Sequence, residues 1–434
     1  MTRDSQLIRA LGIPAFTLII INTIVGSGIF GLPAAAAQVL GAAAPIAYVG
    51  CSLLVGLVAL CFAECGSRVP ATGGTYVWAR TAFGPAVGSS VGYLMAFANL
   101  VGSNAAVGAL LLGSLTRALP HQPAWELKLI VVLIYLLLAL TNIRGVKAGG
   151  RVSTAMALIK VTPLLVLVGA GIFAINSDNL RIVQGPSGKE LGAGMVLLFF
   201  AFMGTEGPLS SIGEVKEPSR TIPRALGLAV LLTGMLYLLV HVVAQGVLGP
   251  HLAEATDAPL AEAAAVVFGP AGRTFLLWAA ILSTTGYFTG DILSGPRMFN
   301  ALGEDGLLPR WLGKVHSVYH TPHVAIAFYA AFCCLLALTG TFRALAVFAS
   351  AGTLVVYLIS VLGLIRLRSM NVQGDVAPFR VPGGLVVPII SSLVIVGLLY
   401  SLSLREQLAT IGLAVVGAIP GLLRGRSGVN GVAA

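Results

Sequence analysis

Apolar residues in this chain fall in long, nearly uninterrupted runs rather than in alternating stripes. A run of about 20 apolar residues can cross a bilayer as a helix, whereas the strands of a transmembrane barrel appear as alternating segments of about 10 residues. The pattern therefore predicts an all-α integral membrane protein. Its expected spans, about twelve in number, are residues 13–38, 43–67, 84–116, 127–143, 152–175, 191–213, 223–249, 272–300, 323–340, 343–366, 385–403 and 406–423.

Two segments between these spans also predict helices. The long loop at 250–271 contains an apolar stretch, Ala258 to Phe268, that favours a short helix lying over the extracellular side. Residues 68–83 have the mixed polar and apolar pattern of a short amphipathic helix. No soluble domain is expected between or after the spans.

Composition and charge support a membrane location. Apolar residues make up 57% of the chain and charged residues 10%, against about 25% charged in soluble domains. The net charge of +10 is carried by short loops, which indicates membrane orientation and not a nucleic-acid partner. With both termini in the cytoplasm, 18 of the 26 Lys and Arg residues lie inside, seven lie outside and Lys160 lies in a span. Ala/Gly-rich spans and the lack of a glycosylation sequon favour a bacterial inner membrane, the plasma membrane of such a cell.

The first span is interrupted near its middle by Gly26-Ser27-Gly28, which are poor helix formers. A broken helix is tolerated at membrane depth where its freed backbone groups line a cavity. The half-helix after the break would point its N–H groups at a carboxylate, and the half-helix before it would offer carbonyls to an ammonium group. A zwitterion is a natural guest, although glycines of this kind also permit close helix packing.

The sixth span contains a second interruption, Gly204-Thr205-Glu206-Gly207-Pro208. Interrupted helices at matching positions of two halves are typical of inverted-repeat transporters and point to the substrate site. We therefore expect a first repeat of five helices at residues 1–176, a second inverted repeat of five helices at 177–368, and two further helices at 369–434.

Four ordered motifs resemble the amino acid–polyamine–organocation superfamily. They are the first-span segment Asn22 to Phe30, the stretch from Glu64 to Gly84, the sixth span and following loop from Phe200 to Ala225, and Pro296-Arg297 with Asp305 to Pro309. The resemblance implies the leucine-transporter fold with its 5+5 inverted repeat, secondary transport and alternating access. It also implies a substrate site at the two interruptions, with the candidate residues Ile24, Gly26, Ser27, Gly28, Gly204 and Glu206.

Ionisable residues inside the membrane are costly and mark functional sites. Lys160 matches a position where similar proton-coupled and exchanging members carry a lysine in helix five, so the resemblance implies a fixed cation in place of sodium. We expect Lys160 to contact the backbone at the first interruption; the alternative is a permanently charged structural bracket. Asp291 in span eight is expected to contact a substrate amine or Lys160, or else a neighbouring helix. His241 is expected to be a packing residue.

Further candidates surround the interruptions. Glu206 would pair with a cationic substrate group or act as a gate, or simply cap the second half-helix. Phe200 and Phe202 precede the break and would close over a bound side chain, Phe200 through a cation–π contact, unless they only pack. Ser103 and its neighbour Asn104 are small polar candidates for the cavity wall.

The expected function is sodium-independent secondary transport of amino acids, coupled to protons or working by exchange. A carrier of polyamines or other organocations is the alternative within transport, and a membrane-embedded enzyme is the alternative from another class. The loop histidines His316, His320 and His323 have spacings that resemble a metal triad, but the loop resembles an ordinary helix connection. We expect no cofactor and no metal; the expected partners are a small-molecule substrate, protons and the lipid bilayer.

Overall fold

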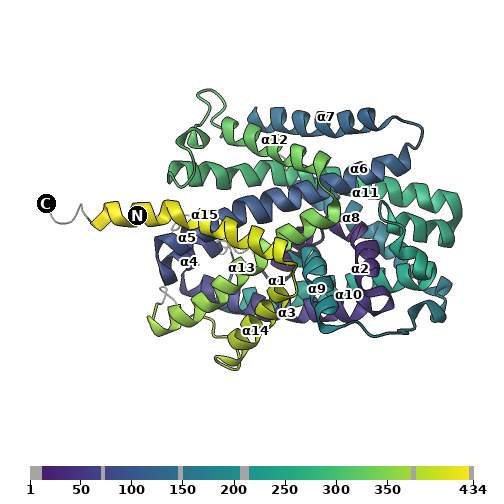
Figure 1. The fold of residues 1–434 in the computed structure, drawn as a ribbon, viewed down its shortest axis with the longest axis horizontal. Coiled ribbons are helices and arrows are strands. Elements are labelled where there is room, and N and C mark those ends of the chain that lie inside the picture. The colour runs from purple at the N-terminus through teal and green to yellow at the C-terminus, as the bar shows by residue number, and fades with distance from the viewer. Residues whose placement is uncertain (1–11, 70–73, 145–149, 206–214, 373–377, 430–434) are drawn as a thin grey trace.

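The computed structural model describes residues 12–69, 74–144, 150–205, 215–372 and 378–429. The side chains of Ser27, 150–159, 218–219 and 425–429 are outside that description. Within the described ranges the chain forms a bundle in which many of the long helices run side by side (Figure 1). The α-helices are α1 (Ile13–Ile24), α2 (Leu32–Leu40), α3 (Ala44–Arg68), α4 (Gly74–Phe83), α5 (Pro85–Tyr93), α6 (Ser103–Ala118), α7 (Ala124–Ile143), α8 (Gly150–Gly171), α9 (Gly188–Phe202), α10 (Pro218–Leu248), α11 (Pro259–Glu304), α12 (His323–Thr339), α13 (Phe342–Ser369), α14 (Val386–Tyr400) and α15 (Leu404–Val429).

Helices form at the apolar runs, and the helices are interrupted at glycine residues. The first run is divided into α1 and α2, as its glycines predict. In the first quarter of α11, Gly269 adopts a φ of 71°, which separates a short leading helix from the long apolar one and confirms that a helix forms near 258–268. The helix α4 confirms the expected helix at 68–83 over Gly74–Phe83, whereas Arg68 belongs to α3 and residues 70–73 lie outside the described ranges. Between α5 and α6 the chain continues as a π-helix, Leu94–Gly102.

The outer surface of the bundle is strongly apolar. Seven helical segments in the described residues are long and apolar enough to cross a membrane, and four shorter apolar helices accompany them. Helices such as α7, α14 and α15 expose large side chains, among them Leu133, Leu137, Leu393 and Ile411. An exposed apolar surface of this extent is costly in water and suits contact with lipid. The protein is therefore a multi-pass membrane protein, while the count of twelve spans stays a prediction.

A buried ion cluster fastens one end of the bundle. Glu64, at the end of α3, is fully buried and accepts hydrogen bonds from the guanidinium groups of Arg68 and Arg368 and from the backbone N–H of Val381, at 2.5–2.9 Å. A carboxylate can accept about four hydrogen bonds, and Glu64 accepts four. These contacts tie α3 to the end of α13 and to the segment before α14, which is the arrangement of an anchor.

Candidate substrate-binding cavity

The first interruption is a short stretch of extended backbone followed by a tight turn of helix. The helix α1 ends at Ile24, Gly26 has φ −93° and ψ −179°, and residues Ser27–Phe30 form a 3₁₀ turn before α2 begins. The carbonyl of Ile24 accepts the N–H of Gly26 at 2.7 Å and the hydroxyl of Tyr237 at 3.0 Å. The last carbonyls of a helix have no partner within it, so the hydroxyl of Tyr237 satisfies one of them from α10.

The second interruption begins where the sequence predicts it. The helix α9 ends at Phe202, and Gly204 adopts a φ of 103°, a conformation that favours glycine. A Cβ atom on Gly204 would lie 2.9 Å from the carbonyl oxygen of Thr23 in α1. The two interruptions therefore lie against each other with backbone almost in contact. Glu206, with residues 207–208, lies outside the described residues.

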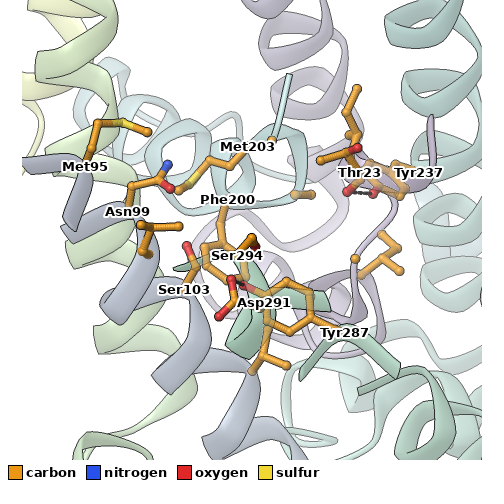
Figure 2. Close-up of a pocket in the computed structure, with 18 residues that line it drawn as sticks. Thr23, Met95, Asn99, Ser103, Phe200, Met203, Tyr237, Tyr287, Asp291 and Ser294 are labelled. Atoms are coloured by element: carbon orange, nitrogen blue, oxygen red, sulfur yellow. Dashed lines mark hydrogen bonds between the residues drawn. The ribbon is translucent and has the colours of Figure 1, made fainter. Parts of the chain in front are cut away.

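A cavity of about 250 Å³ opens beside these two interruptions (Figure 2). This is somewhat below the roughly 300–1,000 Å³ typical of pockets for drug-sized ligands, so it suits a small metabolite. The lining residues come from α1 and the turn after it, the π-helix, α6, α9, α10 and α11: Thr23, Ile24, Gly26, Gly28, Ile29, Met95, Asn99, Leu100, Ser103, Val107, Phe200, Ala201, Met203, Gly204, Tyr237, Tyr287, Asp291 and Ser294.

The cavity brings together most of the residues that the sequence singles out. Those that line it are Ile24, Gly26, Gly28, Ser103, Phe200, Gly204 and Asp291. Phe202 does not line it: its ring is fully buried against Tyr237, 5.4 Å between ring centroids. Two residues along a helix correspond to a turn of about 200°, so Phe200 and Phe202 face nearly opposite directions. The backbone of Ser27 belongs to the interruption, while its side chain lies outside the described residues.

Gly28 of the first interruption and Gly31 at the start of α2 leave room for aromatic rings. A Cβ atom on Gly28 would lie 2.7 Å from the ring of Phe200, and one on Gly31 would lie 3.1 Å from the ring of Phe342 in α13. The two rings pack edge to face, with 5.8 Å between their centroids. Phe200 is thus seated directly over the interruption, between the cavity and Phe342.

Asp291 is the centre of a polar network that joins four helices. Its Oδ2 accepts from the amide of Asn104 at 2.6 Å and from the hydroxyl of Tyr329 at 2.5 Å, and its Oδ1 accepts from the hydroxyl of Tyr287 at 3.2 Å. The hydroxyl of Tyr135 in turn donates to Oδ1 of Asn104 at 2.6 Å. These contacts connect α6, α7, α11 and α12. Asp291 therefore contacts neighbouring helices, and it makes no ion pair with Lys160.

Lys160 is buried, with 6% of its surface exposed, in the helix α8. That helix packs against α10 and α11. In the part of the chain that the structure describes, the ammonium group makes no ion pair and no hydrogen bond, so the expected contact with the first interruption stays a prediction. His241 is fully buried, and its ring lies 5.1 Å from that of Tyr48 on α3, which is a packing contact.

Several lining residues were missed from the sequence. Tyr237, Tyr287 and Ser294 lie in apolar helices, where only the helical phase decides whether a side chain meets the cavity. A tyrosine in the middle of an apolar span is the one available signal, because its hydroxyl needs a partner when buried. The π-helix supplies Met95 and Asn99, and π-helical turns are frequent at functional sites.

The three loop histidines do not gather into a metal site. Among the described residues there is no group of three or more His, Cys, Asp or Glu side chains placed to hold a metal ion. His316 uses its Nδ1 to accept backbone N–H groups of Val318 and Tyr319, at 3.1 and 3.3 Å. That ring therefore holds the turn in its own loop.

An apolar helical bundle with a small internal cavity beside two interrupted helices defines a membrane carrier for a small molecule. Residues 11–418 match the family model described as amino acid permease. The chain therefore belongs to the amino acid permease family, within the amino acid–polyamine–organocation superfamily.

Three relatives illustrate the range of the family. An uncharacterised transporter of Mycobacterium tuberculosis is 31% identical over 364 residues, which cover 82% of this chain and 79% of the relative. The serine/threonine exchanger SteT of Bacillus subtilis is 26% identical, with 97% of each chain covered. The branched-chain amino acid permease BcaP of Lactococcus lactis is 29% identical, with 80% of this chain and 79% of the relative covered. All three relatives are named as transporters, exchangers or permeases, and the names of the second and third state different amino acid substrates.

Proposed function

We propose that this protein is a secondary active transporter that carries amino acids across the plasma membrane by alternating access, without sodium and with both termini in the cytoplasm. The observation that carries the proposal is the cavity at the two interrupted helices, where Gly204 lies against the carbonyl of Thr23. The membership of the amino acid permease family supports it, since relatives are named as exchangers and permeases of amino acids.

The interruptions suit the two charged groups that every amino acid carries. In this proposal, carbonyl oxygens near the C-terminal end of α1 would accept from the ammonium group, and N–H groups of the helical turn that follows would donate to the carboxylate. Recognition by backbone groups is independent of the side chain of the substrate. Closure of the cavity on one side and opening on the other would involve Phe200, whose ring lies over Gly28.

Lys160 supports the sodium-independent part of the proposal. A fully charged ammonium group without a partner is costly when buried in a membrane protein. We therefore assign to Lys160 the role of a titrating or fixed cation that couples transport to protons or supports exchange. The alternative role is a structural bracket, which would leave the dependence of transport on pH unchanged.

Transport by the purified full-length protein in proteoliposomes tests the proposal. We expect uptake of at least one amino acid that is equal in sodium and choline buffers and is driven by an inward proton gradient or by a preloaded amino acid. The variant Lys160→Ala should lose the proton-driven component, because the cation that responds to pH is gone. Uptake that requires sodium, or full pH-dependent uptake by Lys160→Ala, would refute these assignments.

A carrier of amines or polyamines is the second candidate, and Asp291 beside the cavity favours it. Cadaverine has the amino groups of lysine but no carboxylate, so it separates the two functions. Uptake of cadaverine in preference to every amino acid would establish the amine carrier in place of the amino acid carrier.

A further inference from the structure

One carboxylate in the cavity has an oxygen that the described part of the chain does not fully satisfy. The Oδ2 atom of Asp291 accepts from both Asn104 and Tyr329, whereas among the described residues its Oδ1 atom accepts only from Tyr287, at 3.2 Å. A carboxylate offers about four acceptor positions, two on each oxygen. One position on Oδ1 is therefore left for a donor from the cavity that Asp291 lines.

Asp291 also has no counter-charge among the residues that the structure describes. Across the described residues, every ion pair involves another acid, and none brings a Lys, Arg or His to Asp291. The titratable groups that face it are Tyr287 on its own helix, Tyr329 and Cys333 on α12, and Tyr135 on α7, none of which is cationic. Asp291 is partly buried and lines the cavity, and a carboxylate in such a place is expected to meet a positive charge from a bound molecule.

The surroundings of Asp291 suit an organic cation. The rings of Phe200 and Tyr287 line the same cavity, and Ser103 and Ser294 add hydroxyl groups (Figure 2). Aromatic faces attract ammonium and guanidinium groups, and the attraction increases when water is excluded. A carboxylate held rigidly by three donors, beside aromatic rings, combines charge and shape for such a group.

We propose that Asp291 binds the positively charged side chain of the substrate, so that the transporter selects basic amino acids such as lysine or ornithine over neutral ones of equal length. This inference rests on the proposed function, because the backbone interruptions would hold the α-amino and α-carboxylate groups of the same substrate. Asp291 then determines specificity, and Asn104, Tyr287 and Tyr329 position it.

Binding of L-lysine and L-norleucine to the purified full-length protein tests the proposal. The two ligands share one carbon chain and differ by the terminal ammonium group. We expect the wild type to bind L-lysine at least about tenfold more tightly, and Asp291→Asn to reduce lysine affinity at least about tenfold while norleucine affinity is kept. Asp291→Glu should restore part of the preference. Glu406→Gln changes a partly exposed acid that caps the start of α15 and does not line the cavity; it is the matched control and should change neither affinity.

Three outcomes would overturn the proposal. Equal wild-type affinities for the two ligands would do so without any variant, even if Asp291→Asn failed to fold. An equal loss of both affinities in Asp291→Asn would show that Asp291 only supports the helices. If Asp291→Asn lost the pH dependence of norleucine uptake but kept the preference for lysine, Asp291 would be a proton site instead. In each case binding of norleucine would leave the proposed amino acid transport intact, whereas binding of no amino acid at all would refute both.

Discussion

The cavity has two walls that are built in different ways. The backbone wall consists of the interruptions at Val25–Gly28 and Met203–Gly204, where main-chain groups and glycines meet the cavity. The side-chain wall consists of Ser103, Tyr287, Asp291 and Ser294, held from behind by Asn104, Tyr135 and Tyr329. Main-chain groups suit the part that all amino acids share, whereas side chains suit the part that distinguishes them. If the proposed roles hold, binding and selectivity are separable in this protein, and substitutions that alter one wall alone test this separation.

The largest effect is expected at the backbone wall from Gly204→Ala. A side chain at φ 103° is strained by about 1–3 kcal/mol, and the added Cβ would lie 2.9 Å from the Thr23 carbonyl oxygen, which is main chain and cannot rotate away. We expect a clear loss of thermal stability of the purified protein together with loss of binding of every amino acid. The matched control is Gly227→Ala in α10, where an added Cβ meets no atom within 4 Å and stability should be unchanged. A fully stable and active Gly204→Ala protein would contradict the close approach of the two interruptions.

A smaller effect is expected from Gly28→Ala, and Gly26→Ala in the same interruption is its control. An added Cβ would displace the ring of Phe200, since the two would be 2.7 Å apart, whereas an added Cβ on Gly26 would come no closer than 3.9 Å to any atom. We expect Gly28→Ala to weaken binding of basic and neutral amino acids alike, by roughly tenfold, and Gly26→Ala to have little effect. Equal effects of the two substitutions in a binding assay would show that the packing of the Phe200 ring against Gly28 does not affect binding.

The smallest effect is expected from Tyr135→Phe, behind the side-chain wall. The change removes the donor to Oδ1 of Asn104 and leaves a buried acceptor without its partner, at a cost of about 1–3 kcal/mol in stability. Because Asn104 in turn donates to Asp291, the ratio of lysine to norleucine affinity should fall with only a modest change for norleucine. Tyr237→Phe removes a donor to the Ile24 carbonyl at the other wall and should leave that ratio unchanged. A fall in the ratio for Tyr237→Phe would show that the two walls are coupled.

The sequence predicts the backbone wall better than the side-chain wall, for a physical reason. Glycine and proline inside an apolar run are visible without any structure, so the ends of α1 and α9 fall where the sequence places them. An aspartate in a membrane span is equally visible, and Asp291 does line the cavity. The function of the residues at both walls remains a proposal.

The partners of Asp291 are not visible in the same way. Tyr135 and Tyr329 lie 156 and 38 residues from Asp291 in the chain, on helices whose rotation and packing no local pattern determines. Phe202 illustrates the same limit within one helix. It lies only two residues after Phe200, yet Phe200 faces the cavity and Phe202 faces Tyr237. Glu206 lies outside the described residues, so its role as a gate or helix cap stays a prediction.

The most direct test of the central claim is a thermal-shift measurement on the purified protein with the twenty standard amino acids in sodium-free buffer, followed by the carboxamide of any amino acid that stabilises it. If the interruptions hold the α-carboxylate, at least one free amino acid should raise the melting temperature and its carboxamide should raise it far less. No stabilisation by any amino acid, or equal stabilisation by an amino acid and its carboxamide, would contradict the account.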